Sequence, residues 1–300
     1  MQLVFCGTGW LPIVDAIRVR LPTGASIRVR DLTRPLVEEV CDADVLVPSN
    51  AHLDATVINA CPRLKLIQQS AAGYELIDVG AARARGIPVC NVPGANADAM
   101  AQTSLLLMLA LARRLPEAQR SFAEARVGVP LGRELNGKVL GVVGLGRSGS
   151  RMADAARALG MQVISVGSTS GPDAWAAFWR SVDVISLHCP LNEKTRGLLN
   201  DAVFAQVKPG VLLVNCARAA IVDRGALERA LDAGVVGGVG LDVHWEEPWN
   251  PAEPLYARPN VVALPHIGGS TEESFARLAD GVAANIRRLM ANEPLLNRVD

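Results

Sequence analysis

The chain has 300 residues, 50% of them hydrophobic, with 30 Lys plus Arg balanced by 30 Asp plus Glu. This length predicts two domains, and a formal charge of zero excludes a field that would attract nucleic acid or an anionic membrane. We therefore expect a small-molecule ligand, with no nucleic-acid partner and no membrane partner.

Cysteine usage and the apolar segments predict a cytoplasmic protein. The six cysteines are scattered without a CxxC pair, which is typical of reduced thiols. The first residues, MQLVFCGTGW, have no basic segment followed by an apolar one, so they predict a strand and not a secretory signal. The longest apolar run, residues 105–112, is far shorter than the roughly 20 residues of a membrane span and predicts a buried helix.

Short β-rich runs alternate with helical stretches over the first part of the chain, which predicts parallel strands joined by crossover helices. The runs are residues 3–6, 27–29, 45–47, 64–67 and 89–90. Pro93 and Gly94 then break the chain before an apolar helix predicted over about residues 97–115. We place a domain boundary at this break.

A second series of strands is predicted at residues 139–143, 163–166, 184–187, 211–214, 239–241 and 261–264. Six strands suit a doubly wound dinucleotide-binding sheet. A start signal at Ser270, Thr271 and Glu273 predicts a last amphipathic helix that returns to the first domain. The predicted fold is α/β with two Rossmann-like lobes, both doubly wound parallel sheets. A cofactor domain, residues 96–272, is inserted in a flavodoxin-like substrate domain of residues 1–95 and 273–300.

The strand KVLGVV runs into the loop GLGRSG, and a helix and a second strand follow. In this context Gly144 permits a tight turn, Gly146 lets the backbone approach a pyrophosphate, and Gly149 allows close packing of helix on strand. The helix start, with Arg147 and Ser148, then presents free N–H groups to the phosphates. The loop predicts dinucleotide binding; the alternative is a glycine-rich turn with only a structural role.

The second strand of this series ends in VGSTS (166–170), where a carboxylate ordinarily binds the ribose 2′-OH. Small hydroxyl side chains can accommodate a 2′-phosphate that a carboxylate would repel, so Gly167, Ser168 and Thr169 favour NADP(H). No arginine follows at once. The alternative is an NAD site that lacks this hydrogen bond.

An oxidoreductase that acts on a hydroxy or keto acid must bind a carboxylate, polarise a carbonyl and exchange one proton. His266 directly follows a strand of the second series, where open α/β sheets place their ligand crevice. Arg218 follows another strand, and Asp242, Glu246 and Glu247 follow the next. Arginine can bind a carboxylate through two hydrogen bonds, and a glutamate beside histidine favours its protonated form. Taken singly, each charge has an alternative explanation as a solvated loop residue. The remaining histidines are His52, His188 and His244.

With these residues in view, the chain resembles the D-isomer-specific 2-hydroxyacid dehydrogenases, which include glycerate, hydroxypyruvate, glyoxylate and phosphoglycerate dehydrogenases. The resemblance runs over most of the chain from about residue 64. Its motifs, in order, are GYELID (73–78), VPGANADAMAQ (92–102), GLGRSG (144–149), LHCPLNEKT (187–195), NCARAAIVD (215–223), LDVHWEEP (241–248) and LPHIGGST (264–271).

The resemblance implies an NAD(P)-dependent enzyme that interconverts a small 2-keto acid, of the glyoxylate or hydroxypyruvate type, and its D-2-hydroxy acid by hydride transfer. Arg218 would bind the substrate carboxylate and carbonyl. Glu247 would pair with His266, which would give or take the proton. Backbone amides near Ala72 and Gly73 would also bind the substrate carboxylate.

The resemblance further implies cofactor contacts after several strands and a homodimer formed through the cofactor domain. Asp242 would contact the nicotinamide carboxamide, which leaves Glu246 as an exposed neighbour. The other expected contacts are His188, Cys189, Pro190, Cys216, Ala217 and Gly268. No metal is expected.

Four features depart from the family pattern. Ala219 replaces a glycine, Gln102 stands where glutamate is usual, and Gly167 replaces an acid. The stretch 171–180 is short, which leaves little room for a third strand and its helix. We therefore expect a more open adenine end of the cofactor site.

Two alternative functions stay open. Oxidation of phosphite or formate on the same scaffold is an enzymatic one, and a nucleotide-sensing, corepressor-like binding protein belongs to a different class. Retention of the arginine, glutamate and histidine favours an enzyme, since a sensor needs no proton donor. The substrate side chain is expected to contact first-domain loops, including VPSNAH (47–52). Trp245 and Trp249 either line the pocket or serve ordinary packing.

Overall fold

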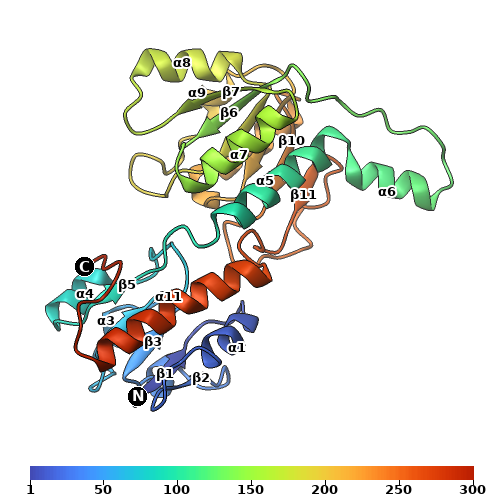
Figure 1. Cartoon of the computed structure of the whole chain (residues 1–300). Coiled ribbons are helices and arrows are strands. Elements are labelled where there is room, and N and C mark those ends of the chain that lie inside the picture. The colour runs from blue at the N-terminus through green and yellow to red at the C-terminus, as the bar shows by residue number, and fades with distance from the viewer. The chain divides into compact units, whose positions relative to one another are not determined.

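The computed structural model describes residues 1–300 and divides them into two compact units (Figure 1). Unit 1 comprises Met1–Asn96 and Ser270–Asp300, and unit 2 comprises Ala97–Gly269. Each unit is built around a parallel sheet of its own. None of the helices combines the length and the apolar character that a membrane span requires.

The unit 1 sheet has five parallel strands in the order β2-β1-β3-β4-β5, which is the flavodoxin-like order. The strands are β1 (Gln2–Phe5), β2 (Ser26–Val29), β3 (Val45–Val47), β4 (Leu66–Gln68) and β5 (Val89–Cys90). They lie at or next to the β-rich runs of the sequence. Residues such as Leu3, Leu46 and Ile67 are fully buried, as expected of a sheet that is covered on both faces.

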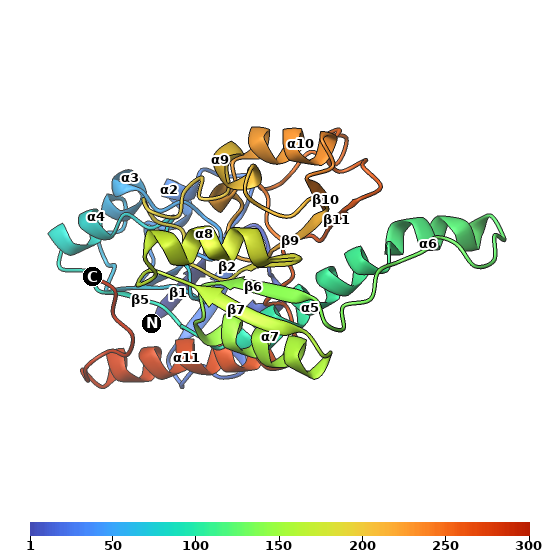
Figure 2. The same ribbon diagram turned by 90° about the horizontal axis from the view of Figure 1, so that it is seen from above.

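Helices cover both faces of the unit 1 sheet (Figure 2). One face is covered by α1 (Pro12–Arg18) and α11 (Glu272–Met290), and the other by α2 (Leu36–Glu39), α3 (Ala55–Asn59) and α4 (Val79–Ala84). The hydroxyl of Thr271 accepts a hydrogen bond from the Ser274 N–H and caps α11. This long helix follows unit 2 in the sequence but packs in unit 1.

The segment after α11 is fastened to β5, the edge strand of unit 1. The N–H of Val299 donates to the carbonyl of Val89 (2.9 Å), and the N–H of Asn91 donates to the carbonyl of Asn297 (3.2 Å). The buried Asn285 of α11 accepts a hydrogen bond from the Leu296 N–H at 2.8 Å. These bonds cover an edge that would otherwise expose unpaired main-chain groups.

The unit 2 sheet has six parallel strands in the order β11-β10-β9-β8-β6-β7, and all six predicted strands are present. They are β6 (Val139–Val143), β7 (Gln162–Val166), β8 (Val184–Leu187), β9 (Val211–Asn215), β10 (Val236–Leu241) and β11 (Val261–Ala263). β7 is an edge strand. From β7 the chain passes through α8 (Pro172–Ser181) to β8, which pairs with β6 on the opposite side from β7. The short stretch 171–180 thus adds a helix and no strand beyond β7.

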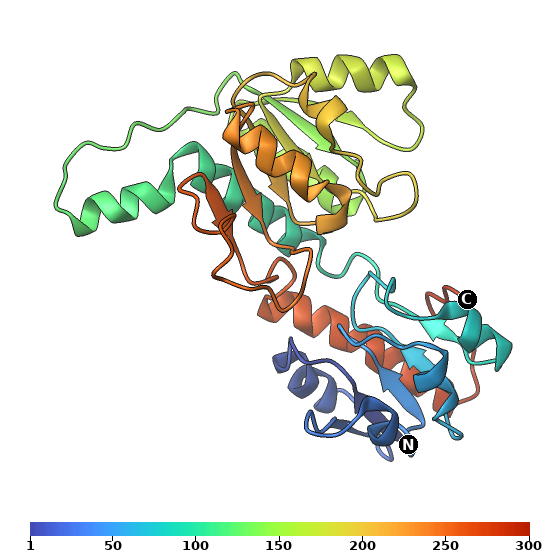
Figure 3. The same ribbon diagram turned by 180° about the vertical axis from the view of Figure 1, so that it is seen from behind.

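Both faces of the unit 2 sheet are also covered by helices. α5 (Ala97–Ala112) and α7 (Arg147–Ala158) pack on one face. α8, α9 (Asp201–Phe204) and α10 (Arg224–Asp232) pack on the other, as Figures 1 and 3 show from opposite sides. The predicted doubly wound α/β architecture is therefore confirmed in both units.

The first helix of unit 2 ends earlier than the apolar pattern predicts. Residues 97–115 were expected to form one helix, but α5 ends at Ala112. Arg114 adopts a left-handed backbone conformation (φ 52°), and Pro116 lies at the start of a further helix, α6 (Leu115–Ala123). In Figure 3, α6 and the chain that follows it extend away from the unit 2 sheet.

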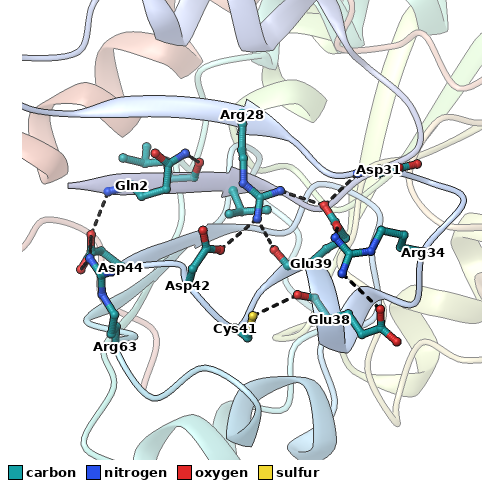
Figure 4. A network of polar contacts seen from close by, with 12 residues as sticks. Gln2, Arg28, Asp31, Arg34, Glu38, Glu39, Cys41, Asp42, Asp44 and Arg63 are labelled. Atoms are coloured by element: carbon teal, nitrogen blue, oxygen red, sulfur yellow. Dashed lines mark hydrogen bonds and ion pairs between the residues drawn. The ribbon is translucent and has the colours of Figure 1, made fainter.

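Polar contacts fasten α2 and the segment before β3 to the strands of unit 1 (Figure 4). The buried Glu39, at the end of α2, accepts hydrogen bonds from Arg28 of β2 (2.8 Å) and from the main-chain N–H of Asp31 (3.0 Å). The N–H of Asp31 is the main cause that lowers the pKa of Glu39. Asp44, just before β3, accepts the N–H of Gln2 at 2.8 Å. The first contacts join β2 to α2, and the last joins β1 to the segment before β3.

Candidate active site

The loop between β6 and α7 contains three glycines in different surroundings. Gly144 has φ 94°, and a Cβ on it would lie 2.8 Å from the main-chain nitrogen of Cys189. A Cβ on Gly149 would overlap the carbonyl oxygen of Gly144. No atom lies within 4 Å of the Cβ position on Gly146. Backbone packing therefore requires the first and third glycines, whereas Gly146 keeps space open in front of α7.

The start of α7 is suited to an anionic group. No side chain caps this helix, whereas Asp223 caps α10 and Thr271 caps α11. An uncapped helix start presents unpaired N–H groups and the positive end of the helix dipole. Arg147 is exposed and Ser148 is half-buried at this start. The residues present thus fit the pyrophosphate of a dinucleotide.

His188 links the end of β8 to the first turn of α7. Its Nε2 lies 2.9 Å from the Ser186 hydroxyl and its Nδ1 lies 3.2 Å from the Ser148 hydroxyl. Burial lowers the pKa of His188 to about 4, so the ring is neutral at pH 7. A neutral imidazole donates from one nitrogen and accepts at the other, and serine hydroxyls can do either. His188 therefore holds the first turn of α7, at the end of the glycine loop.

The other residues expected around the cofactor differ in exposure. Cys189 and Ala217 are half-buried, Pro190 is exposed, and Cys216 is buried. Burial raises the pKa of Cys189 to about 11 and that of Cys216 to about 12, so both thiols are neutral at pH 7. Cys216 acts as core packing beneath this surface.

The end of β7 forms a small polar turn. The N–H of Gly167 donates to the Ser170 hydroxyl (3.1 Å), and the N–H of Ser170 donates to the carbonyl of Gly167 (3.0 Å). Ser168 and Thr169 are exposed, and no atom lies within 4 Å of the Cβ position on Gly167. Two hydroxyl side chains therefore stand at an open rim of unit 2.

The structure brings His266 and Glu247 into direct contact. Nδ1 of His266 lies 2.9 Å and 2.8 Å from the two carboxylate oxygens of Glu247, and the two side chains are 29% and 27% exposed. Burial by itself raises the pKa of Glu247, but the hydrogen bond from His266 and the main-chain N–H of His244 outweigh burial and lower it. Glu247 is therefore ionised at neutral pH, and Nδ1 of His266 carries a proton towards it.

The backbone at His266 is held in an unusual conformation by Asp242. His266 has φ 54°, a left-handed value that is uncommon outside glycine. The fully buried Asp242 accepts the N–H of Ile267 (2.8 Å) and of Gly268 (2.7 Å). Burial raises the pKa of Asp242 although these two N–H groups oppose the shift. A Cβ on Gly268 would lie 2.6 Å from this carboxylate, so only glycine fits there.

His244, to which the sequence assigns no role, contacts both Glu247 and the chain just before His266. Its Nε2 donates to the carbonyl of Leu264 at 2.9 Å, two residues before His266. Its main-chain N–H donates to Glu247 Oε1 at 3.1 Å. The ring packs against Trp249, with 4.5 Å between centroids. The signal for this role was its position, two residues after Asp242 in the same loop. Trp249 thus serves packing, and Trp245 donates through Nε1 to the carbonyl of Val222 (3.0 Å).

Arg218 follows β9 and is held by its own loop. Its carbonyl accepts a hydrogen bond from Asn215 Nδ2 (2.9 Å), and its Nη1 donates to the carbonyl of Ala217 (2.8 Å). β9, β10 and β11 are neighbours in the sheet, so Arg218, Glu247 and His266 all follow the carboxyl ends of adjacent strands. Glu246 is exposed.

Ala72 and Gly73 belong to unit 1, in the loop after β4. The carbonyl of Ala72 accepts a hydrogen bond from Asn91 Nδ2 (2.7 Å), and the carbonyl of Gly73 accepts one from Gln69 Nε2 (2.9 Å). Both amide side chains are buried. The sequence motifs pointed to Ala72 and Gly73 but not to the two side chains that hold them.

Comparison with known proteins gives the family. The family model described as "D-isomer specific 2-hydroxyacid dehydrogenase, NAD binding domain" matches residues 105–268, more than half of the chain. The glyoxylate reductase of Thermococcus litoralis is 38% identical over 271 residues, which cover 84% of this chain and 82% of that protein. The chain belongs to this family. The resemblance drawn from the sequence motifs is thereby confirmed, and the family is one of oxidoreductases with an NAD-binding domain.

Other relatives differ in length and in name. Rat D-3-phosphoglycerate dehydrogenase is 36% identical over 278 residues, 88% of this chain and 52% of that protein. The chain thus spans about half the length of the curated phosphoglycerate dehydrogenases that it matches. The crystal structure of the TT0316 protein from Thermus thermophilus has a TM-score of 0.89 and 35% identity, with 100% of both chains covered. This full-length match confirms the fold.

Proposed function

We propose that the chain interconverts a small 2-keto acid, of the glyoxylate or hydroxypyruvate type, and its D-2-hydroxy acid with a nicotinamide cofactor. The observation that carries the proposal is the contact between His266 and Glu247 at the carboxyl end of the unit 2 sheet. An imidazole backed by a carboxylate can supply the proton that reduction of a carbonyl requires. The names of the relatives, glyoxylate reductase and D-3-phosphoglycerate dehydrogenase, support a substrate of this class.

Each proposed role follows from a contact or a charge. When bound, the nicotinamide ring supplies the hydride for reduction and accepts it in oxidation. Because Glu247 engages Nδ1 of His266, we assign proton exchange with the substrate oxygen to Nε2. The Glu247 carboxylate accepts the Nδ1 proton of His266 and so holds the ring for proton exchange at Nε2. Arg218 is assigned the substrate carboxylate, which a guanidinium can bind through two hydrogen bonds, and the N–H groups of Ala72 and Gly73 are assigned the same carboxylate.

Steady-state assays with glyoxylate and hydroxypyruvate test the proposal. His266→Ala is expected to lower kcat by about 10²- to 10⁴-fold, while the Kd of the reduced cofactor, measured by fluorescence, stays unchanged. Equal losses of kcat and of cofactor affinity would contradict the role of His266. Tight cofactor binding without turnover of any keto acid would support a nucleotide sensor. Turnover of formate or phosphite alone would support the oxidation alternative.

For the cofactor we propose a preference for NADP(H). The exposed hydroxyls of Ser168 and Thr169 support it, because they accommodate a 2′-phosphate that a carboxylate would repel. Thr169→Asp is expected to weaken NADPH binding and leave NADH binding nearly unchanged. The measurement is the Kd of each reduced cofactor for the wild type and the variant. A tighter Kd for NADH than for NADPH in the wild type would reverse the assignment.

We also propose that the chain forms a homodimer through unit 2. The extension after α5 supports it, because Phe122, Val127 and Leu131 are 87%, 97% and 81% exposed. Apolar side chains this exposed on one segment are typical of a surface that another protein covers. Phe122→Asp is expected to give a monomer in light scattering, and Val19→Asp, which changes a 78% exposed residue of unit 1, is the control. A monomeric wild type would refute the proposal.

A cytoplasmic location is proposed on the state of the thiols. All six cysteines are free in the structure, including the exposed Cys41. Free thiols are typical of a reducing compartment. Fractionation of cells that express the chain, with blotting of the cytoplasmic and secreted fractions, checks the location.

A further inference from the structure

Three successive carbonyl groups after β4 are turned towards buried partners in unit 1. The carbonyl of Ala71 accepts the N–H of Val92 (3.0 Å), that of Ala72 accepts Asn91 Nδ2, and that of Gly73 accepts Gln69 Nε2. Val92, Asn91 and Gln69 are 7%, 7% and 4% exposed.

In a trans peptide the carbonyl of one residue and the N–H of the next point in opposite directions. The N–H groups of Ala72, Gly73 and Tyr74 are therefore turned away from the buried partners. None of the three donates to a protein acceptor. Consecutive N–H groups of this kind bind an anion such as a carboxylate. The loop after β4 is thus prepared for one carboxylate.

Gln69 holds this loop through a fully used side-chain amide. Its Oε1 accepts the N–H of Ser49 (3.1 Å) and of Ser70 (2.9 Å), and its Nε2 donates to the carbonyls of Ser49 (3.0 Å) and Gly73 (2.9 Å). These four bonds tie the loop after β3 to the loop after β4. Ser49 has φ 55°, a strained value for serine that persists only where surrounding contacts fix it.

The loop after β1 is joined to the loop after β3. Asn50 Oδ1 accepts the N–H of Thr8 (2.9 Å), and Asn50 Nδ2 donates to the Thr8 hydroxyl (2.9 Å). The three loops read GTGW (7–10), PSNA (48–51) and QSAAGY (69–74), all uncharged. They follow the carboxyl ends of β1, β3 and β4, where open α/β sheets bind ligands. This edge of unit 1 offers neutral amides and hydroxyls around the N–H groups that suit a carboxylate.

We propose that Gln69 is a positioning residue for the N–H groups of the loop after β4, and that the three uncharged loops restrict the substrate to unphosphorylated 2-keto acids with a single carboxylate. It rests on the proposed function, which assigns the substrate carboxylate to the N–H groups of Ala72 and Gly73. Gln69 fixes those groups through the carbonyl of Gly73. A second anionic group on the substrate would lose its hydration at these three loops without gaining a charged partner from them, and that loss disfavours binding.

Gln69→Glu tests the positioning role, because it keeps the shape of the side chain and removes both donors. It also sets a carboxylate against the carbonyls of Ser49 and Gly73. The control is Gln102→Glu, the same chemical change at an exposed position of α5. For hydroxypyruvate we expect Gln69→Glu to raise KM at least about tenfold with kcat nearly unchanged, the pattern of lost uniform binding. The Kd of the reduced cofactor stays unchanged, and the control behaves as the wild type. An unchanged KM in Gln69→Glu overturns the role.

A matched pair of substrates tests the specificity in the wild type, whether or not the variant folds. Hydroxypyruvate and 3-phosphohydroxypyruvate differ only by a phosphate. We expect kcat/KM to be at least about 100-fold higher for hydroxypyruvate, a difference of about 2.7 kcal/mol. Equal turnover, or a preference for the phosphorylated acid, refutes the inference and leaves the proposed function standing. No turnover of either acid or of glyoxylate refutes the proposed function itself.

Discussion

Nε2 of His244 donates a hydrogen bond to the carbonyl of Leu264 at 2.9 Å, just before the residue that we propose as proton donor. Because a carbonyl only accepts, Nε2 carries the proton, and in the neutral ring Nδ1 accepts from the Tyr256 hydroxyl at 3.0 Å. The proton on Nε2 therefore points to a group that cannot take it. His244 thus holds the backbone that carries His266 and transfers no proton.

Two replacements of His244 distinguish the contact of its Nδ1 from the contact of its Nε2. Asn reaches only the position of Nδ1, whereas Gln extends an amide donor to the position of Nε2. We expect His244→Asn to lower kcat by about 10- to 100-fold through misplacement of His266. His244→Gln should recover most of this loss. Stopped-flow and steady-state kinetics with hydroxypyruvate are the measurements. Tyr256→Phe, which keeps the Leu264 contact, is the control, and a larger loss in it than in His244→Asn would show that the wrong contact was chosen.

Glu247→Gln should reduce catalysis without harming the fold. The glutamine keeps the shape but loses the negative charge opposite Nδ1 of His266, so kcat is expected to fall about 10²-fold. The pKa of Glu247 lies below its ordinary 4.5, so its charge is present from neutral pH down to that value and is lost only as pH falls further. In the kcat/KM profile of the wild type, the loss from this group should therefore lie at a lower pH than an ordinary glutamate would give. Glu246→Gln, at the exposed neighbour, should match the wild type.

The middle and last glycines of the loop can be told apart by one methyl group. Gly149→Ala places a Cβ against the Gly144 carbonyl and is expected to cost about 1–3 kcal/mol of unfolding free energy. Gly146→Ala meets no atom within 4 Å, so its Tm should stay near that of the wild type. Its Kd for the reduced cofactor should rise at least about tenfold, because the methyl occupies the approach to α7. Calorimetry and fluorescence titration provide the two readouts. A stable Gly149→Ala would disprove the packing argument.

His188 should make unit 2 sensitive to mild acid. Its pKa is about 4 in the folded chain against an ordinary 6.5, because burial disfavours the charged ring. Between these values the unfolded chain binds a proton that the folded chain does not, so stability falls as pH drops from 6.5 towards 4. The full loss, reached near pH 4, amounts to roughly 3 kcal/mol, of which about 2 kcal/mol falls between pH 7 and pH 5. Urea unfolding at pH 7 and pH 5 measures it, and His188→Gln should show a smaller difference between the two. An equal difference in both proteins would remove His188 as the cause.

The strands were predictable because most of them are short continuous apolar runs bounded by turns. β9, whose five residues are all buried, is the clearest case. β10 begins at Val236, three residues before the predicted start, because Gly237 and Gly238 interrupt the apolar run. Those glycines fit a crowded sheet: a Cβ on Gly237 would lie 2.7 Å from the carbonyl of Gly210. The end of α5 escaped prediction, since a left-handed Arg114 has no signature in residue type.

The candidate site, too, was predictable only in part. Glu247 and His266 were predicted to meet because residues after adjacent parallel strands converge at one edge of a sheet. Gln69 and His244 were missed because each acts by a side-chain bond to a main-chain group of another loop, Ser49 and Leu264, 20 residues away in each case. Such bonds depend on how two loops approach each other, which motif spacing does not encode.

During synthesis of the chain, unit 2 is completed before unit 1. Unit 1 needs α11 and the segment that pairs with β5, both of which follow Gly269, whereas every part of unit 2 precedes α11. On the ribosome, unit 2 can therefore fold while the amino-terminal strands still lack the helix that covers one of their apolar faces. During that interval the nascent chain exposes the kind of surface that chaperones bind, and the amino-terminal part is the segment most open to aggregation.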